Sequence, residues 1–541
     1  MLKKILIALL AVAMCLALVA CTTTTPVEEP VDDAVEAPVE DGTEDVVEEE
    51  PVEEEPVEEP EAAIDTSEFV VIDHVVLGDP DANDNWRVVQ DEANKYLESK
   101  INAHHELNWT GWTDYKSKYD MMVASGEELD LVDCASTWLD LWPHASKGAW
   151  YILDDLLPVY APLTWAEISP DVWDCAKYKG QIVCIPEDCY PQAVNHGVFY
   201  RGDWAKEAGV YDIRSYADLE VYLQWIADNK AADGVVPYDT SSAGGLFSGY
   251  IYTETEHIST QAAGLYAESW ENYWKLIDVY QTDAAKEYFA LAKSWYEKGF
   301  WRTDALNYTG SSRDQLQAGL GGLDQHHVET YTGLVVTMEE KIPGSDLKMF
   351  QWWMGKTNNG VGEPVTHGAQ TISVNSKNPE RALMVYEMLR QDETFFHYIH
   401  YGIEGWQYVI NEDGLRAEPE GYDSAVDGYW SNFWCGRPGK FLIPHVKDWP
   451  NKTAYTAEAL SHLKLYPYGS FIFDKAPISA EVDAVNAVNT AHREALYLGM
   501  AGDPEVALAA YIAERDAAGF QVLFDECQRQ MDEYHDYMEG N

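Results

Sequence analysis

Residues 69–136 alternate between apolar runs and amphipathic segments, and this pattern restricts the fold more than any other feature of the chain. The run FVVIDHVVL is typical of a strand buried on both faces of a sheet. Trp86, Val89, Ala93, Tyr96 and Leu97 form one apolar side at a period close to 3.6 residues, which predicts a helix. HELNWTGW predicts a second strand, and TDYKSKYDMMVASGEELDLVDCAST predicts a helix, a turn and a third strand. This alternation indicates a doubly wound α/β domain.

Ligands of doubly wound proteins bind beyond the carboxyl ends of the parallel strands. The loop after the first predicted strand carries Asp79, and the loop after the third carries Ser136 and Trp138. We therefore expect these three side chains to lie at a binding site.

The amino terminus has the organisation of a secretory leader. Lys3 and Lys4 precede an apolar stretch of 15 residues, which is too short to predict a membrane-spanning helix. The sequence Leu-Val-Ala-Cys that ends at Cys21 resembles the lipobox of bacterial lipoproteins, which implies cleavage and lipidation at that cysteine. We expect residues 1–20 to be a signal peptide and Cys21 to anchor the protein to the outer face of the cell membrane. The alternative is an ordinary cleaved signal peptide with a chance cysteine.

Residues 27–63 contain 18 acidic residues, no basic ones and a loose repeat of PVEE-like units. Such a segment cannot bury enough apolar surface to offset its ordering entropy, so residues 21–67 are predicted to form a disordered tether. As a flexible coil the acidic segment would span on the order of 35 Å, and charge and proline would extend it further. An acidic interaction tail is the alternative.

The remaining body is strongly acidic and rich in aromatic residues, with 20 Trp, 34 Tyr and 14 Phe in the whole chain. Setting aside the tether's 18 acids and the leader's two lysines changes the chain charge of −57 to −41 for residues 62–541. This charge excludes a nucleic-acid-binding protein, which would need a basic patch. The body's cysteines match no zinc spacing, and secretion permits disulfides without predicting a pairing. They are Cys134, Cys175, Cys184, Cys189, Cys435 and Cys527.

Several motifs of the body together resemble one known family. ASGEELDLVDCASTW, ASKGAWYILDDLLPVYAP and YKGQIVCIPE followed by GVFYRGDWAKEAGV are similar to extracellular solute-binding proteins of ABC importers, the family-1 sugar-type lipoproteins. SVNSKNPERALMVYEMLR is similar to that family's Ser-Lys-Asn-Pro-Glu-Ala helix. YGIEGWQYVINEDG, YGSFIFD and the closing GDPEVALAAYIAERDAAGFQVLFDECQRQMDEY resemble its LipO/LplA-like branch. The resemblance runs from about Phe69 to the end of the chain.

The resemblance implies a periplasmic-binding-protein-like fold, with two α/β lobes joined by a hinge of about three crossovers. By position, the crossings are expected near 193–199, 365–371 and 466–474. Lobe 1 would comprise residues 68–195 and about 368–466, and lobe 2 would comprise about 196–367 and 467–541.

The resemblance also implies a function without catalysis. Such a receptor captures a small-molecule solute, here most readily an oligosaccharide, in the cleft between its lobes and delivers it to the permease subunits of an ABC importer. We expect a monomer that needs no cofactor and meets the membrane only through its lipid. Because the region of about 405–465 departs from better-known sugar binders, the identity of the solute stays open and a peptide is an alternative.

A cleft for sugars needs flat aromatic rings beside polar side chains, because sugars present both C–H faces and hydroxyl edges. Trp270, Trp274, Ile277 and Trp295 are expected on amphipathic helices, where they serve packing. Loops that mix aromatic and polar side chains supply the predicted ligand-binding residues. These are Asp79, Ser136, Trp138, Glu187, Tyr190, Asn195, Tyr238, Asp239, Gln325, His327, Trp406, Trp430, Trp434 and Phe471.

The sequence contains no HExxH, GxSxG or P-loop motif. The adjacent histidine pairs at 104–105 and 326–327 do not share a helix face and are interpreted as hydrogen-bonding groups, not as metal ligands. The loop at Asp79 begins like a calcium loop, but Asp84 stands where the turn glycine belongs and Gln90 where the bidentate glutamate belongs. We expect no catalytic residue and no metal site.

Two other classes of protein would share the leader, the tether and the aromatic richness. A surface-anchored glycoside hydrolase would turn over glycans, whereas a receptor would bind them saturably without turnover. An adhesin or wall-binding lipoprotein would make weak, multivalent contacts and would show no lobe closure.

Overall fold

The computed structural model of the chain describes residues 64–539 except for 114, 137, 188–195, 261, 431–434, 437 and 470. The predicted signal peptide, Cys21 and residues 21–63 of the predicted tether lie outside the described residues, as do Tyr190, Asn195 and Trp434. Residues 64–67, the last of the predicted tether, are described and contact the body: Arg381 donates to the carbonyl of Asp65 at 3.2 Å, and Asn102 donates to that of Thr66 at 3.0 Å. From Asp65 onwards the chain forms one compact unit. No helix in the described part of the chain is long and apolar enough to cross a membrane.

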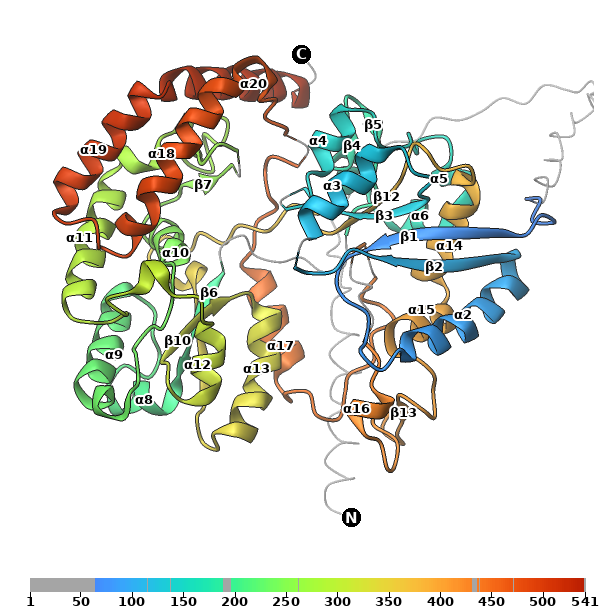
Figure 1. Cartoon of the computed structure of the whole chain (residues 1–541), viewed down its shortest axis with the longest axis horizontal. Helices are drawn as coiled ribbons and strands as arrows, with labels where there is room; N and C mark the ends of the chain where they lie inside the picture. Colours follow the sequence, from blue (N-terminus) through green and yellow to red (C-terminus); the bar gives the residue numbers. More distant parts are fainter. Residues whose placement is uncertain are drawn as a thin grey trace, which may run out of the picture. The chain divides into compact units, whose positions relative to one another are not determined.

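A four-stranded sheet in the order β12-β3-β1-β2 forms the centre of lobe 1 (Figure 1). β1 (Val70–Val76) pairs in parallel with β2 (Ala103–Trp109) and β3 (Leu131–Cys134), whereas β12 (Ala369–Ile372) runs antiparallel to β3. The second half of β1 is almost entirely buried, as expected for an apolar run covered on both faces. The predicted strand, helix, strand, helix, strand order is confirmed.

Helices cover this sheet and contact one another. α2 (Asn85–Ile101) contacts β2 and α15 (Glu393–Tyr401), and α14 (Pro379–Gln391) contacts β1, β2 and β12. α2 buries four of the five apolar side chains that the helical period predicts, and the fifth, Tyr96, is half-buried. α3 (Tyr115–Ser125) connects β2 to β3.

Lobe 2 contains a different kind of sheet. β6 (Gly197–Arg201) is its central strand and pairs antiparallel with β10 (Leu323–His326) and β11 (Leu347–Gln351). All five residues of β6 are buried. A side chain at Gly197 would bring its Cβ to 2.3 Å from the carbonyl oxygen of Phe350, so only glycine allows β6 to lie this close to β11.

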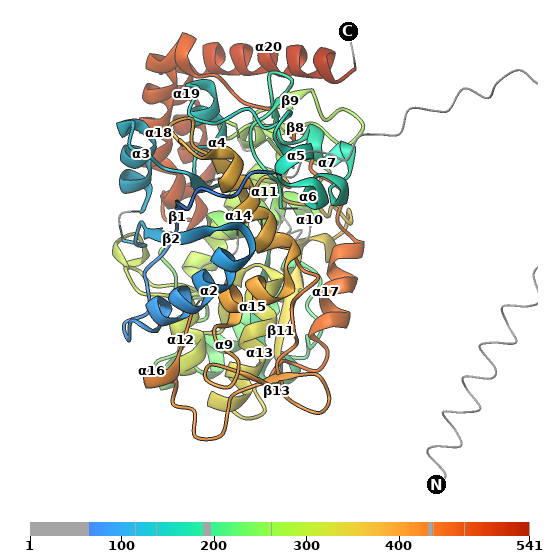
Figure 2. The same ribbon diagram turned by 90° about the vertical axis from the view of Figure 1, so that its right-hand side faces the viewer.

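Three carboxy-terminal helices complete lobe 2 (Figures 1 and 2). α18 (Ser479–Tyr497) contacts α19 (Pro504–Ala517) and α20 (Phe520–Met538), and both α18 and α19 contact α11 (Asp283–Glu297). The remaining helices are α4 (Leu141–Ser146), α5 (Leu157–Tyr160), α6 (Pro162–Glu167), α7 (Pro170–Asp174), α8 (Gly202–Glu207), α9 (Tyr216–Asn229), α10 (Gly244–Glu254), α12 (Ser312–Ala318), α13 (Val328–Lys341), α16 (Ser424–Asp427) and α17 (Lys452–Ser461). The remaining strands are β4 (Lys177–Tyr178), β5 (Gln181–Ile182), β7 (Ile258–Ser259), β8 (Tyr266–Ala267), β9 (Leu276–Ile277), β13 (Val409–Ile410) and β14 (Arg416–Ala417).

One predicted element is wrong. Trp270, Trp274 and Ile277 were expected on helices, but they lie in and around the turn between β8 and β9, which pair antiparallel. Their predicted role in packing is confirmed, because all three pack against the lobe 2 core, and Trp295 is 1% exposed in α11. Closely spaced aromatic residues fit a short hairpin as well as a helix, so their spacing could not decide between the two.

The two lobes have separate hydrophobic cores. The buried core of lobe 1 draws on residues 72–185 and 369–408, and the main core of lobe 2 on residues 198–361 and 466–531. The chain therefore changes core between Ile185 and Val198 and again between Val361 and Ala369.

Helix α17 packs on lobe 2, before the third predicted crossing near 466–474. The ring of Tyr455 lies 5.0 Å from that of Tyr331, and its hydroxyl accepts a hydrogen bond from Gln351 at 3.0 Å. Figure 1 shows α17 beside α13, which it contacts. The exact lobe limits stay a prediction, but this packing favours a third crossing before α17.

The described cysteines form no disulfide. Cys134, Cys175, Cys184, Cys435 and Cys527 are all free, and Cys189 lies outside the described residues.

Candidate interlobe binding site

Three loops of lobe 1 meet where the parallel strands β1, β2 and β3 end. The loop after β1 carries Asp79, which is exposed and accepts the backbone N–H of Trp112 at 3.4 Å. Trp112 lies in the loop after β2, and Ser136 and Trp138 lie in the loop after β3. Helix α3, which begins at these loops, lies on the side of lobe 1 that faces lobe 2 (Figure 1). Because the carboxyl ends of parallel strands share one edge of the sheet, the three loops form a single wall.

Trp112, Tyr115 and Trp138 form a row of aromatic rings on this wall. The rings of Trp112 and Tyr115 meet edge to face with centroids 6.0 Å apart, and those of Tyr115 and Trp138 do so at 5.7 Å. Trp112 is 44% exposed, and the other two rings are half-buried. The row therefore presents apolar ring surface beside polar loops, which is the combination that a sugar needs.

Only Trp138 of this aromatic row was predicted. The motif HELNWTGW was interpreted as a strand to its last residue, whereas β2 ends at Trp109. Trp112 and Tyr115 thus lie beyond the carboxyl end of a parallel strand, the same position that identified Asp79 and Trp138. Applying that rule to β2 as well would have found them.

Ser136, Glu187 and Thr366 lie where the second crossing passes the end of β3. The backbone N–H of Ser136 donates to the carbonyl of Thr366 at 2.8 Å, and that of Glu187 donates to the carbonyl of Val365 at 2.7 Å. A Cβ atom at Gly368 would lie 2.6 Å from the Glu187 carboxylate, so the Glu187 side chain lies directly against the crossing. Among the described residues, the buried hydroxyls of Ser136 and Thr366 have no hydrogen-bond partner. Each of them therefore has unused hydrogen-bonding capacity at the edge of the sheet.

Four histidines gather where the lobes join. His326 ends β10 and His327 follows it, His196 precedes β6, and His367 comes from the second crossing. The rings of His196 and His326 stack with centroids 5.9 Å apart, and His327 meets both, at 4.2 Å from His326 and 5.8 Å from His196. His327 also caps α13 by accepting the backbone N–H of Thr330 at 3.2 Å.

Three of these imidazoles, those of His326, His327 and His367, are held in the neutral form. Burial, together with His326 and His196, lowers the pKa of His327 to about 2, and burial lowers the pKa of His367 to about 4. Burial and the nearby Arg313 also lower the pKa of His326. A neutral imidazole has one donor and one acceptor nitrogen, so the cluster suits hydroxyl-bearing ligands.

The lobe 2 residues predicted to bind ligand have different surroundings. Gln325 lies against the start of α10, where a Cβ atom at Gly245 would come within 2.6 Å of its amide oxygen. Asp239 is 5% exposed, accepts the Tyr308 hydroxyl at 3.2 Å and lies 3.7 Å from Arg302. Tyr238, another predicted ligand contact, is 5% exposed and belongs to the lobe 2 core, so its ring packs within the lobe.

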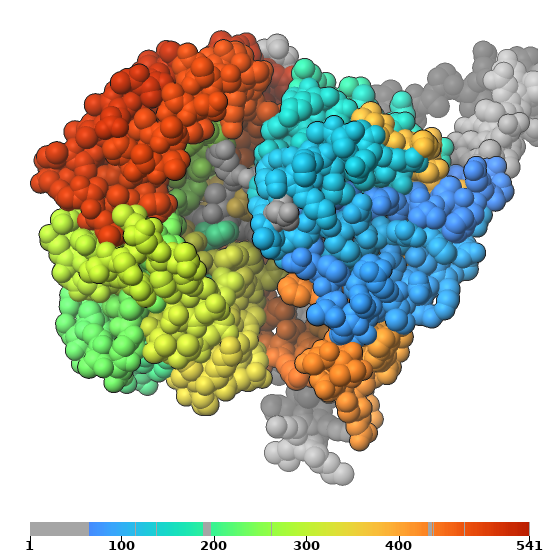
Figure 3. All heavy atoms as spheres, in the orientation of Figure 1, coloured from blue at the N-terminus to red at the C-terminus, as the bar shows by residue number. Residues whose placement is uncertain are grey.

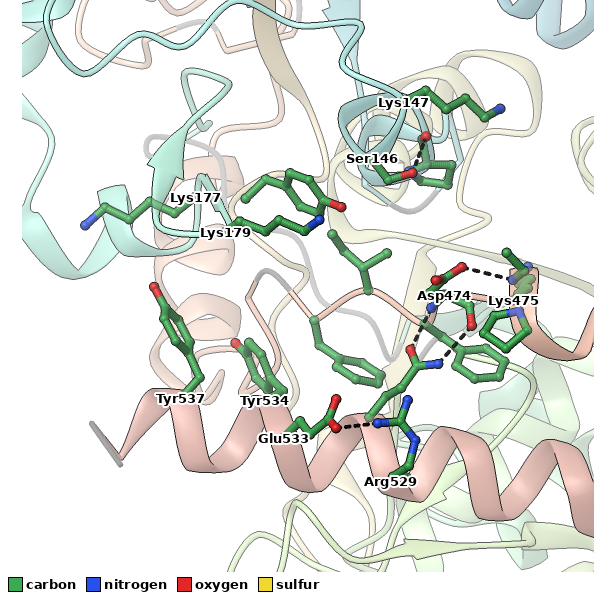
Figure 4. A pocket seen from close by; sticks show the side chains of 18 of the residues that line it. Ser146, Lys147, Lys177, Lys179, Asp474, Lys475, Arg529, Glu533, Tyr534 and Tyr537 are labelled. Atoms are coloured by element: carbon green, nitrogen blue, oxygen red, sulfur yellow. Dashed lines mark hydrogen bonds and ion pairs between the residues drawn. The ribbon is translucent and has the colours of Figure 1, made fainter.

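A cavity of about 970 Å³ opens between the lobes near the end of the chain. One wall comes from α4 and the β4–β5 hairpin of lobe 1, and the other comes from residues 471–477 and α20. Phe471, a predicted ligand contact, lines this cavity. Figure 3 shows the surface hollowed between the two lobes, and Figure 4 shows Tyr534 and Tyr537 of α20 facing the hairpin that carries Lys177 and Lys179.

Trp406 and Trp430 lie in the long insertion, beside helix α16. The Trp406 indole donates to the Asp427 carboxylate at 3.0 Å, and the backbone N–H of Trp430 donates to Asp81 at 2.7 Å. The Trp430 ring is 67% exposed. The insertion therefore docks on the loop after β1, at the outer end of the lobe 1 wall.

The side chains of the site were also compared with the requirements of a metal site. Within the described residues, no group of three or more His, Cys, Asp or Glu side chains is arranged to hold a metal ion.

Known proteins share both sequence and structure with this chain. A protein of Streptococcus pneumoniae serotype 4, named carbohydrate ABC transporter substrate-binding protein, is 22% identical over 486 residues, which cover 87% of this chain and 92% of that protein. Residues 467–536 match a family model described as a domain of unknown function (DUF3502).

Two solved structures extend the comparison. The N-glycan transport solute binding protein (NgtS) from Streptococcus pneumoniae has a TM-score of 0.70 at 19% identity, covering 86% of this chain and 98% of that one. The same protein in complex with Man1GlcNAc has a TM-score of 0.65 at 20% identity, covering 86% and 99%. These likenesses confirm the predicted fold class of two hinged α/β lobes.

Proposed function

We propose that this chain is an extracellular solute-binding protein that captures an oligosaccharide between its lobes and delivers it to the permease of an ABC importer. The fold supports a hinged receptor, and the relative of similar length is named a carbohydrate substrate-binding protein. The neighbouring structure with Man1GlcNAc favours a glycan over a peptide as the solute.

The aromatic row of Trp112, Tyr115 and Trp138 is the observation that carries this proposal. Its rings lie at the carboxyl ends of parallel strands, where doubly wound proteins bind ligands. The histidine cluster and the hydroxyls of Ser136 and Thr366 supply neutral hydrogen-bonding groups for sugar hydroxyls. Glu187 lies beside these hydroxyls, which makes it a further candidate contact.

The function is binding without turnover. The relatives are named substrate-binding or solute-binding proteins, and this favours a receptor over the surface-anchored glycoside hydrolase. We further infer that Cys21 carries the lipid anchor and that the acidic segment after it serves as a tether, because the leader ends in a lipobox-like sequence.

Calorimetric titration of the protein with neutral mannose- and N-acetylglucosamine-containing oligosaccharides tests the proposal. Saturable binding without product formation is expected, and Trp112→Ala should weaken it. Met121→Ala is the matched control, because Met121 is 66% exposed on the same helix as Tyr115 but is not part of the row. Product release at catalytic rates, or no binding to any glycan, would overturn the proposal.

A further inference from the structure

The interlobe cavity has an unusual charge for so acidic a protein. Residues 62–541 carry −41, yet five cations line the cavity against three carboxylates. The cations are Lys147, Lys177, Lys179, Lys475 and Arg529, and the carboxylates are Asp140, Asp474 and Glu533.

Most of these charges are already neutralised by a neighbour. Lys177 pairs with Asp174 at 2.6 Å, and Asp140 pairs with Lys116 at 2.7 Å. Arg529 pairs with Glu526 at 2.6 Å and also with Glu533.

Three lysines of the cavity wall remain without a carboxylate partner among the described residues, namely Lys147, Lys179 and Lys475. The one lining carboxylate without a cation partner there, Asp474, accepts the backbone N–H of Ala476 at 2.9 Å. The cavity wall therefore presents three lysine ammonium groups that form no ion pair with a carboxylate of the described residues.

Lys179 lies at the turn of the β4–β5 hairpin, and its side chain extends into the cavity. Lys179 and Gly180 form the turn of the β4–β5 hairpin with φ values of 51° and 81°, so the turn is tight and left-handed. The Lys179 ammonium lies 5.2 Å from the centroid of the Tyr178 ring. Figure 4 shows the Lys179 side chain running from the hairpin into the space between the two walls.

The cavity also offers apolar ring surface on both sides. Tyr178 comes from lobe 1, whereas Phe471 and Tyr534 come from the carboxy-terminal region and lie with ring centroids 5.5 Å apart. Lysine ammonium groups attract carboxylate and phosphate groups. Partly exposed aromatic rings stack against the apolar C–H faces of sugars.

We propose that this cavity is a subsite for an oxyanion-bearing sugar residue, so that the transported oligosaccharide is acidic. The inference rests on the proposed function, which it makes more specific. It also gives the region of 467–536 a role: residues 471–477 and α20 supply one wall of the subsite, and the β4–β5 hairpin supplies the other. A ligand held by both walls would bridge the two lobes.

Titration calorimetry of the full chain with three probes tests the subsite. The probes are neutral mannotriose, trigalacturonate with carboxylates, and a mannotriose that carries a 6-phosphate. We expect at least one acidic probe to bind about tenfold more tightly than the neutral one at low salt, with the preference shrinking in 0.5 M NaCl. The two acidic probes distinguish a carboxylate ligand from a phosphate ligand.

The variant Lys147→Gln/Lys179→Gln/Lys475→Gln should lose the acidic preference and keep neutral binding. All three side chains are exposed, so the thermal midpoint should hardly change. The control Lys100→Gln/Lys206→Gln/Lys341→Gln removes the same charge from exposed lysines that do not line the cavity, and it should keep the preference.

The outcomes separate this inference from the proposed function. Equal binding of acidic and neutral probes, or an acidic preference that survives the cavity variant, would overturn the subsite while leaving the receptor intact. Failure of all three probes to bind would overturn the subsite, whereas the receptor is overturned only if the oligosaccharides of the first titration also fail to bind. Acidic binding that needs the lysines but is insensitive to Trp112→Ala would support the subsite and contradict the aromatic row.

Discussion

The ring of Tyr115 stands edge-on between the indoles of Trp112 and Trp138 and joins the loops that follow β2 and β3. Each tryptophan is thus held by a neighbouring ring while part of its surface stays accessible. Trp138 packs partly on the lobe 1 core, whereas Trp112 is the more exposed of the two.

Trp112→Ala should separate ligand binding from stability. Loss of an aromatic anchor typically costs about 1–3 kcal/mol of binding free energy. Removing a side chain that is 44% exposed should cost well under the roughly 3–5 kcal/mol expected for a core tryptophan. Calorimetry and urea unfolding of the same variant measure both quantities. Intact affinity with a large loss of stability would assign Trp112 to packing.

Trp138→Ala should weaken binding by a similar amount and cost more stability than Trp112→Ala, because its ring contributes to the lobe 1 core. Trp295→Ala serves as the reference for a fully buried indole, since Trp295 is 1% exposed in lobe 2. A stability loss for Trp138→Ala as large as that of Trp295→Ala, without any change in affinity, would contradict the site.

Lobe 1 could be predicted from sequence, whereas lobe 2 could not. β1 is a long β-branched run, and its two partners begin within about 60 residues, so local patterns predict three strands of the sheet; the fourth, β12, comes from a distant part of the chain. β6 has five residues, and its partners begin at Leu323 and Leu347, more than 120 residues further on. The spacing of apolar residues within a segment cannot predict which distant strand that segment pairs with.

The part of the site that follows locally recognisable strands could also be predicted. Trp138 follows a recognisable strand, so its position indicated a binding loop. Tyr238 also follows an apolar run, but that run leads into the lobe 2 core. A core tyrosine and a cleft tyrosine have the same sequence signature, and only the fold separates them. The histidine cluster joins residues from three separate segments and could not be assembled from sequence.

Arg515→Met should destabilise the carboxy-terminal helices. Arg515 is 1% exposed and its guanidinium lies 3.0 Å from the Asp278 carboxylate, which is itself buried. Removing the cation leaves a buried, uncompensated carboxylate, which typically costs about 3–5 kcal/mol. Urea unfolding should show that loss, and Arg515→Met/Asp278→Asn should recover much of it. A single variant as stable as the wild type would contradict this account.

Cys21→Ser should release the protein from the membrane. The change removes the thiol that would receive the lipid, so the protein should accumulate in the medium or as an unprocessed precursor. Cell fractionation with detection of the precursor measures this, and Cys15→Ser in the apolar stretch is the matched control. Retention at the membrane with a mature amino terminus elsewhere would exclude Cys21 as the anchor.

The histidine cluster should make stability depend on pH below about 6.5. The folded-state pKa of His327 is about 2 and that of His367 is about 4, both below the ordinary value. Between those values and about 6.5 the unfolded chain binds more protons, so the free energy of unfolding falls as the pH falls, by up to about 1.4 kcal/mol per pH unit for each histidine. Buried carboxylates with a raised pKa, such as Asp133, act in the opposite direction in every variant and cancel in the comparison.

His327→Asn isolates this contribution. Asparagine is a good helix N-cap, so it can replace His327 at the start of α13 without titrating. Urea unfolding of wild type and variant at pH 6.5, 5.5 and 4.5 should give a shallower fall for the variant, by up to about 1.4 kcal/mol per pH unit. Ser311→Asn, a change at the N-cap of α12 that removes no titrating group, should leave the wild-type slope unaltered. Parallel slopes for the wild type and His327→Asn would show that His327 is not held neutral in the folded protein.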